Sequence, residues 1–223
     1  MSYSNDVVGR EPQVTHSQNG YGPKKVSRLR AHRTVVIEKA LYVMKLSKHP
    51  EGITAEYLKR KMKVPDHAFF RLFDSIDDFQ DELISAGWKD LLRCLRHVAA
   101  RTTGREGLQA IIAEYRKFVN ENKGVYYLAV CQGRDSAIGR KNQSQLNRLL
   151  HIILATCELS GIDYDTAARN LADVLQGLAV VEITGGCLGQ EPAVTHLLNN
   201  YIYRLFAEQT AEKPILGHVN GKP

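Results

Sequence analysis

The sequence predicts an all-α protein, and three observations support this prediction. Apolar residues recur at spacings of three and four along most of the 223 residues, which is the period of an amphipathic helix. Gly, Pro and short polar capping residues separate these apolar runs at intervals that suit helices of ordinary length. No stretch alternates apolar and polar residues as a half-buried strand does, and no internal repeat is evident.

The two ends of the chain differ in composition from the part between them. Residues 1–23 are rich in Ser, Asn, Gln and Gly and are predicted to form a disordered extension. Residues 210–223 contain Pro214, Gly217, Gly221 and Pro223, and they are predicted to be a flexible tail. The length between these ends suits one large helical unit or a small domain fused to a larger one.

Three helices are expected in the first third of the chain. The first covers 26–47, where a single apolar stripe is interrupted only by Lys39, and it ends at the cluster 49–52. Thr54 is the expected N-cap of a short second helix that ends near Lys63. A third short helix begins at Pro65–Asp66.

Longer helices are expected in the remainder. One runs from a cap at Asp74 or Ser75 to about Ala100, and another follows the break at 102–104. A short apolar segment, 125–131, comes after Gly124. The last three helices are expected over 141–160 with Gly161 as C-cap, from a cap at Asp163 or Asp165 to Thr184, and over 193–208.

The positive charge is concentrated near the N-terminus. The whole chain carries a net +6, yet residues 24–63 hold twelve Lys or Arg against three Glu, a net +9 that leaves −3 for the rest. A basic end joined to a near-neutral body is typical of a protein that binds nucleic acid through that end.

Several functional classes are disfavoured. The four cysteines are widely spaced without a C-x-x-C pair, so neither a zinc site nor a disulfide framework is expected. No phosphate loop, zinc-protease helix or nucleophile elbow is present, so no enzyme, cofactor or metal is predicted. No apolar run is long enough for a membrane span or a signal peptide, so the protein is expected in the cytoplasm. Binding of the basic arm to a membrane surface is a weaker idea, because residues 24–33 offer no strongly apolar face.

Two short helices joined by a tight connection, within a basic stretch, predict a helix-turn-helix. In that motif the second helix enters the major groove, and Phe69 and Phe73 are one turn apart, where they can hold it from behind. Arg71 is expected to reach guanine or phosphate. Asp66 is able to accept a hydrogen bond from cytosine or to cap the helix, and the cap is favoured. The DNA-facing residues are expected to be Lys24, Lys25, Arg28, Arg30, Thr54, Lys63, Asp66, His67, Ala68, Phe70 and Arg71.

Residues 53–79 resemble the signature of the TetR family of transcriptional regulators. That signature has a Thr before the second helix, a Gly-Val turn, a Leu-Tyr pair followed by a Phe, and Ser-Lys-x-x-Leu at the start of the fourth helix. The residues that match it or substitute conservatively are Thr54, Leu58, Val64, Ala68, Phe69, Phe70, Phe73, Ser75 and Phe79. The resemblance implies a helix-turn-helix domain over 24–75 and an effector-binding and dimerisation domain over 76–209.

Four positions depart from this signature. Lys63 replaces the turn Gly and would be strained if its φ is positive. Phe70 lacks the hydroxyl of the phosphate-contacting Tyr, Leu72 stands where the family often has His, and Ile76 replaces a phosphate-contacting Lys. These departures motivate an alternative, a TetR-like helical dimer that has lost DNA reading and acts through a protein or small-molecule partner.

The second half resembles the effector domain of the TetR subgroup named for a Trp-His-Gly triplet. Segment 108–128 contains a Tyr-Arg-x-Phe helix, with Gly124 in place of the subgroup's Pro. Segment 172–182 resembles the triplet region, with Gln176 in place of His and Gly177 retained. The resemblance therefore extends over about 26–206.

The family resemblance implies a ligand-responsive regulator, most simply a repressor, that binds double-stranded DNA as a homodimer on a palindromic operator. The last two helices would form a four-helix bundle with a partner, through Leu171, Leu175, Gly177, Leu178, Leu197, Leu198, Tyr201 and Leu205. A pocket for a small-molecule effector would be lined by Trp88, Leu92, Tyr115, Tyr126, Tyr127, Cys131 and His151. Both sets have a simpler alternative, as ordinary core or surface of a single chain.

Overall fold

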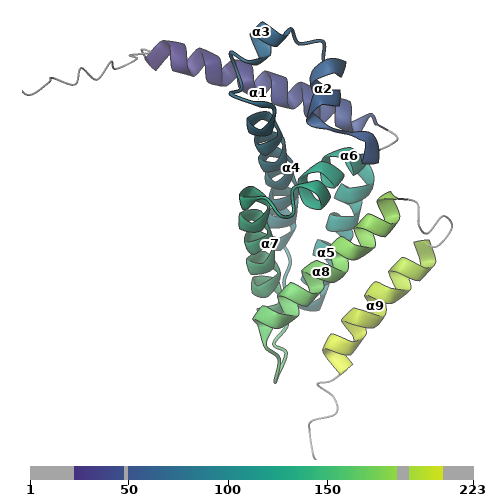
Figure 1. Cartoon of the computed structure of the whole chain (residues 1–223). Helices are drawn as coiled ribbons and strands as arrows, with labels where there is room; N and C mark the ends of the chain where they lie inside the picture. The colour runs from purple at the N-terminus through teal and green to yellow at the C-terminus, as the bar shows by residue number, and fades with distance from the viewer. Residues whose placement is uncertain (1–22, 48–49, 185–190, 208–223) are drawn as a thin grey trace, which may run out of the picture.

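The computed structural model describes residues 23–47, 50–184 and 191–207, and side chains of the first helix from His32 onward. All secondary structure in these ranges is helical, which confirms the predicted class (Figure 1). The elements are α1 (Pro23–Lys45), η1 (Pro50–Gly52), α2 (Ala55–Lys61), α3 (Asp66–Phe69), α4 (Ile76–Ala99), α5 (Gly104–Glu121), α6 (Lys123–Tyr126), η2 (Tyr127–Gln132), α7 (Ala137–Ala155), α8 (Tyr164–Ile183) and α9 (Glu191–Ala207).

The helices α1, α2 and α3 lie together at one end of the molecule, and we call this part the head (Figure 1). Its core is built around three fully buried rings, Phe69, Phe73 and Phe79, whose centroids lie 4.9–5.2 Å apart. Met44 of α1 and Leu58 of α2 complete this core. Such aromatic clusters stabilise a small domain beyond the area that they bury.

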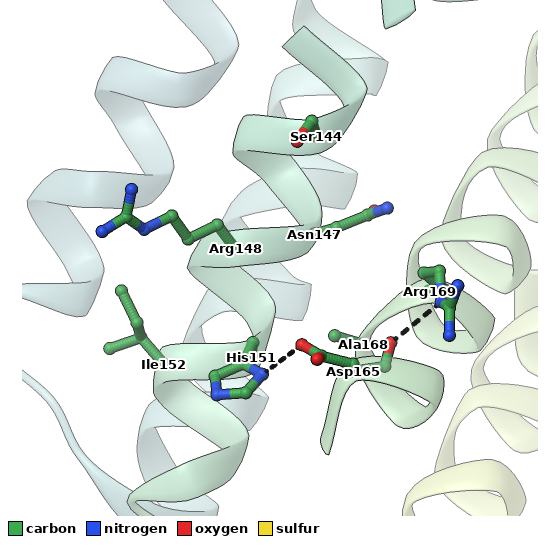
Figure 2. Close-up of a pocket in the computed structure, with 8 residues that line it drawn as sticks. All are labelled: Ser144, Asn147, Arg148, His151, Ile152, Asp165, Ala168 and Arg169. Carbon is green, nitrogen blue, oxygen red and sulfur yellow. Dashed lines mark hydrogen bonds and ion pairs between the residues drawn. The ribbon is translucent and has the colours of Figure 1, made fainter. Parts of the chain in front are cut away.

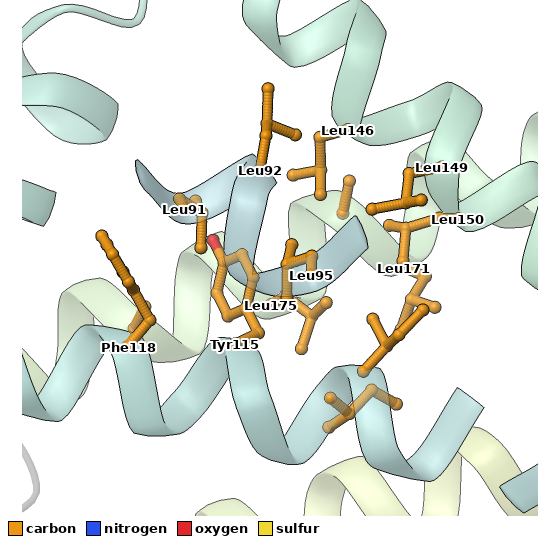
Figure 3. Close-up of a cluster of buried hydrophobic side chains, with 14 of the residues drawn as sticks. Leu91, Leu92, Leu95, Tyr115, Phe118, Leu146, Leu149, Leu150, Leu171 and Leu175 are labelled. Atoms are coloured by element: carbon orange, nitrogen blue, oxygen red, sulfur yellow. The ribbon is translucent and has the colours of Figure 1, made fainter. Parts of the chain in front are cut away.

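The helices α4, α5, α7, α8 and α9 enclose a second and larger core, which we call the body (Figure 1). Figure 3 shows leucines of α4, α7 and α8 gathered around Tyr115 of α5, with Phe118 of the same helix to one side. The helix α9 joins this core through Leu198 and Ile202. Burial of apolar surface at about 25 cal/mol per Å² is the main force that holds these helices together.

One short segment belongs to both cores. Val125 and Leu128 pack in the head core, whereas Tyr126 and Ala129 pack in the body core. The segment changes from α-helix to a wider π-helical turn at Tyr127, which is typical of functional positions in helices. Consecutive residues of α6 and η2 thus connect the head to the body.

Side-chain caps start several helices where the sequence predicts them. Thr54 Oγ1 accepts from the Tyr57 amide at 3.1 Å, as expected. Of the alternative caps, Ser75 and Asp163 hold the position: Ser75 accepts from the Asp78 amide, and Asp163 from the Asp165 amide. Each cap satisfies an amide that has no partner within its helix.

Two helices, α7 and α1, have boundaries that differ from the prediction. The helix expected over 141–160 is α7, which begins at Ala137 because Ser136 caps it, and which ends at Ala155. Gly161 (φ 72°) therefore lies in the loop after α7 and is not its C-cap; the first left-handed residue after the helix is Glu158 (φ 53°). The first helix begins at Pro23, earlier than expected. Proline suits this first position because the amide N–H of the first helical residue has no partner within the helix. None of the described helices combines the length and apolar content that a bilayer-spanning segment needs.

Candidate nucleic-acid interface

The second and third helices form a compact helix–turn–helix on the outer side of the head. Phe69 and Phe73 face the head core and are fully buried, whereas His67 and Arg71 are exposed and Phe70 is 50% exposed. The spacing of these residues gives α3 and the turn after it one apolar and one exposed face. The structure therefore has the predicted division into buried residues that anchor α3 and exposed residues that face outward, and Ala68 is half-buried between the two sets.

Lys59 of α2 ties the two short helices together. Its Nζ lies 2.9 Å from Asp66 Oδ1 and 4.6 Å from the centroid of the Phe70 ring. Asp66 is the first residue of α3, and the N-cap is Pro65 without a side-chain hydrogen bond. The expectation that Asp66 caps the helix is therefore wrong, because its carboxylate turns to the Lys59 ammonium.

The turn between α2 and α3 has the strain that its sequence suggests. Lys63 adopts φ 53°, in the left-handed region that glycine occupies without cost. Lys39, the single polar interruption in the apolar stripe of α1, reaches across and donates to the Met62 carbonyl at 3.2 Å. This hydrogen bond satisfies a carbonyl at the end of α2. It also explains why a lysine stands in the apolar stripe of α1.

Arg33 joins α1 to α4. Its Nη2 lies 2.9 and 3.0 Å from the two carboxylate oxygens of Asp78, it also pairs with Glu82, and its guanidinium stacks 4.9 Å from the Phe73 ring centroid. The Arg33 guanidinium is thus neutralised by two carboxylates, although the sequence alone counts it among the basic residues expected near DNA. The side chains of Lys24, Lys25, Arg28 and Arg30 lie outside the described residues, although the backbone of α1 includes them.

Most of the predicted effector residues gather in or beside the body core. Trp88, Leu92, Tyr115 and Tyr126 are buried, and Tyr127 and Cys131 are half-buried against them. Trp88 Nε1 donates to the Ala129 carbonyl at 2.9 Å, on the π-helical turn. A hollow of about 280 Å³ opens beside Trp88 and is lined on its other side by polar residues of α7, among them Gln143, Ser144 and Asn147.

Two hydroxyls meet inside this core. The hydroxyls of Tyr115 and Tyr126 lie 2.7 Å apart, and burial raises the pKa of both phenols. Burial likewise raises the pKa of the Cys131 thiol to about 11, so this cysteine is a protonated and unreactive group. The core around the two phenols offers hydrogen bonds and apolar surface, whereas Arg134, Asp135 and Arg140 supply charge in the lining of the hollow beside Trp88.

His151 does not belong with this set. It lies on the outer side of α7, in a surface groove of about 570 Å³ between α7 and α8 (Figure 2). Its Nδ1 is 2.7 Å from Asp165 Oδ1, and Arg169 donates to the Asp165 backbone carbonyl, so these polar groups satisfy one another.

The predicted dimer residues divide into two groups. Leu171, Leu175 and Leu198 are buried in the core of their own chain, whereas Leu178, Tyr201 and Leu205 are only partly covered. Gly177 is exposed, and a Cβ at this position would meet no atom within 4 Å in the same chain. The side chain of Leu197 lies outside the described residues. Exposed Val180 and Tyr203 add apolar surface that the sequence analysis did not single out.

Several contacts of the head could not be anticipated from the sequence. The pair Arg33–Asp78 joins residues 45 positions apart, and no pattern links Lys59 to the ring of Phe70. The only signal for Lys39 was that it broke an otherwise apolar stripe. A polar residue in an apolar stripe indicates that its side chain has a polar partner, but the sequence does not show that this partner is the Met62 carbonyl.

Solved structures share this fold. A TetR-family transcriptional regulator from Streptomyces coelicolor superposes with a TM-score of 0.62 at 15% identity, over 82% of this chain and 84% of that one. A protein of unknown function from Rhodococcus sp. RHA1 superposes with a TM-score of 0.58 at 17% identity, over 76% of this chain and 93% of that one. No protein-family model and no curated protein sequence matches the chain. The chain therefore has a TetR-like fold, and membership of the Trp-His-Gly subgroup stays a prediction.

Proposed function

We propose that this protein is a ligand-responsive transcriptional repressor that binds a palindromic operator as a homodimer. The observation that supports DNA binding is the outward face of α3 and its following turn. His67, Phe70 and Arg71 face solvent there while Phe69 and Phe73 fix the helix from behind. A short helix that is rigidly supported and exposed along one side can enter a major groove.

The charge around this face supports the same proposal. Arg60, Lys61, Lys63 and Arg71 are exposed, and in the described part of the chain none of them has a carboxylate partner. The sequence adds Lys24, Lys25, Arg28 and Arg30 on α1. Cations of this number give sequence-independent affinity for the phosphate backbone, which positions the reading helix.

The homodimer is proposed from the open faces of α8 and α9. Gly177 leaves room for a close helix approach, and Val180 of α8 and Tyr203 of α9 (65% exposed) offer apolar surface on these two helices. A two-fold axis through this face would present two copies of α3 to two half-sites. The effector is proposed to enter the core around Trp88, Tyr115 and Tyr126, where apolar surface surrounds a few hydrogen-bonding groups.

The first test is a selection of genomic DNA fragments by the purified protein, followed by titrations of the recovered fragments at several salt concentrations. The proposal predicts a shared palindrome, and an affinity for it that falls steeply with salt. Weak, sequence-independent binding that disappears at moderate salt would contradict the proposal.

That negative result would favour a second candidate, a helical dimer that acts through a protein or small-molecule partner. The structure offers a specific reason to keep it. Arg33 and Lys59, two cations of the head, are occupied by Asp78, Glu82 and Asp66. Phe70 and Ile76 also lack the polar atoms with which a side chain holds phosphate.

A further inference from the structure

The surface formed by α4 and α7 has a concentration of positive charge. Arg96 Nη2 of α4 donates to Gln145 Oε1 of α7 at 2.7 Å. Further along both helices, the amide of Gly104, which follows α4, donates to Thr156 Oγ1, which follows α7. The two helices therefore run side by side in the same direction. Lys89, Arg93 and Arg96 recur at i, i+4 and i+7 along α4, and Lys141 and Arg148 do so on either side of Gln145. We call these five cations the basic face.

The basic face lacks the carboxylates that usually neutralise such a set. Segment 89–99 of α4 contains one acidic residue, Asp90, and α7 contains none. Asp90 pairs with Arg93 at 3.0 Å. Among the described residues, Lys89, Arg96, Lys141 and Arg148 have no acidic partner, and all four side chains are exposed.

The side chains on the two edges of α7 have different surroundings. Figure 2 shows Arg148 pointing away from the His151–Asp165 pair and from Arg169, which lie toward α8. The α8 edge therefore holds the His151–Asp165 pair, whereas on the α4 edge Asp90 is the single carboxylate among five cations. Crowded like charges repel, and an anion that contacts several of them relieves that repulsion.

The size of the basic face favours a compact anion. Seven residues of helix rise about 10 Å, so each row of cations is about 10 Å long. Arginine presents planar donor pairs that match phosphate oxygens. Arg96 is bonded to Gln145 of α7, and Arg148 follows Gln145 by one helical turn. Residues 89–96 lie roughly 20–30 Å along α4 from its first residue, Ile76, which is at the head. A duplex bound by α3 would therefore not contact them.

We propose that the basic face binds the phosphate groups of a small phosphorylated ligand, at a site separate from the DNA-reading head. Arg96 and Arg148 hold the phosphate oxygens from the two helices, and Lys89 and Lys141 neutralise the remaining charge. The ligand bridges α4 and α7. The side-chain amide of Gln145 is already bonded to Arg96 and keeps that guanidinium in place.

The test is a calorimetric titration of the full chain with pyrophosphate, at an ionic strength kept constant with sodium chloride. Saturable binding is expected, and Arg96→Gln with Arg148→Gln weakens it about tenfold. The matched control is Arg134→Gln with Arg169→Gln, which removes the same charge from residues that contact Asp173 and Asp165. The control binds pyrophosphate as the unaltered chain does.

Three results would overturn the proposal. The first is heat no larger than that of chloride at equal ionic strength, and the second is an equal loss in both double variants. The third is an affinity unchanged in Arg96→Gln with Arg148→Gln, which would place the pyrophosphate elsewhere on the chain. If that variant does not fold, Lys89→Gln with Lys141→Gln tests the same face without disturbing the Arg96–Gln145 bond.

Discussion

Lys59 and Asp66 form an ion pair of 2.9 Å across the turn that joins the two short helices of the head. The pair places a carboxylate at the start of the helix proposed to read DNA, and it engages an ammonium that phosphate would otherwise attract. Asp66 is 79% exposed in this pair, so the interaction stabilises the fold by less than about 1 kcal/mol. Its main effect is on the charge that the exposed face of α3 presents.

Replacement of Asp66 by Asn should therefore strengthen non-specific DNA binding. Release of Lys59 adds about one phosphate contact, so the slope of log K against log salt becomes steeper by about one unit. The measurement is a salt titration with a random duplex. Asp81→Asn removes an equal charge from an exposed position on α4 and should leave the slope unchanged. Equal slopes in all three proteins would show that Lys59 does not reach DNA.

Lys63→Gly should stabilise the protein by about 1 kcal/mol, because φ 53° is strained for a residue with a Cβ. The measurement is the urea midpoint of unfolding. Lys63→Ala removes the same charge but keeps the Cβ, so it should not share the gain. If the Ala and Gly variants unfold at the same midpoint, charge and not backbone strain governs this position.

Arg33→Ala should destabilise the protein by about 1–2 kcal/mol, because Asp78 and Glu82 then face one another without a cation. The side chains are about one-third exposed, which keeps the cost below that of a fully buried pair. Glu82→Gln in the Arg33→Ala background should recover part of the loss. Additive effects of the two substitutions in a double-mutant cycle would show that the contact is not energetically coupled.

Tyr115→Phe should cost about 1–2 kcal/mol, because the hydroxyl of Tyr126 loses its partner inside an apolar core. Tyr126→Phe should cost a similar amount. The double variant should cost clearly less than both together, since no unpaired hydroxyl remains. Thermal unfolding of the four proteins measures this, and a double variant as unstable as the sum would argue against the bond.

The same two phenols predict how stability depends on alkaline pH. Their pKa values are raised by burial above the ordinary value of 10.0, so the folded state keeps protons that the unfolded state releases. Their contribution to stability is complete below pH 10 and is lost progressively as the pH rises above it. Urea titrations from pH 8 upward should show this decline, and the Tyr115→Phe/Tyr126→Phe variant should show a shallower one.

The helical class and the burial of individual residues were predictable because both follow from local periodicity. Trp88 and Phe79 are buried as the apolar spacing indicates, and Thr54 caps α2 as its position before an apolar run suggests. The strain at Lys63 was also foreseeable, since a lysine replaces a glycine expected at a turn. Such features depend on a few neighbouring residues.

Features that depend on distant residues were not predictable. His151 has the residue type of a ligand-binding group, but its helix turns it outward toward Asp165. Leu171 has the apolar character of an interface residue, yet the packing of its own chain already covers it. The basic face likewise appears only when α4 and α7 lie side by side, because its two rows are about fifty residues apart in the sequence.

The shared segment of α6 and η2 limits how freely the head of this protein can be exchanged. An artificial repressor is often built by transplanting a reading head onto a foreign sensor, which assumes that the head is a separable module. Here Val125 and Leu128 fill the head core from the far side, and a Cβ on Gly124 would approach the Met44 carbonyl to 2.5 Å. A transplant cut after α3 would leave Met44 and Ile53 uncovered, so a working chimera must bring the start of α4 and the α6–η2 segment with it.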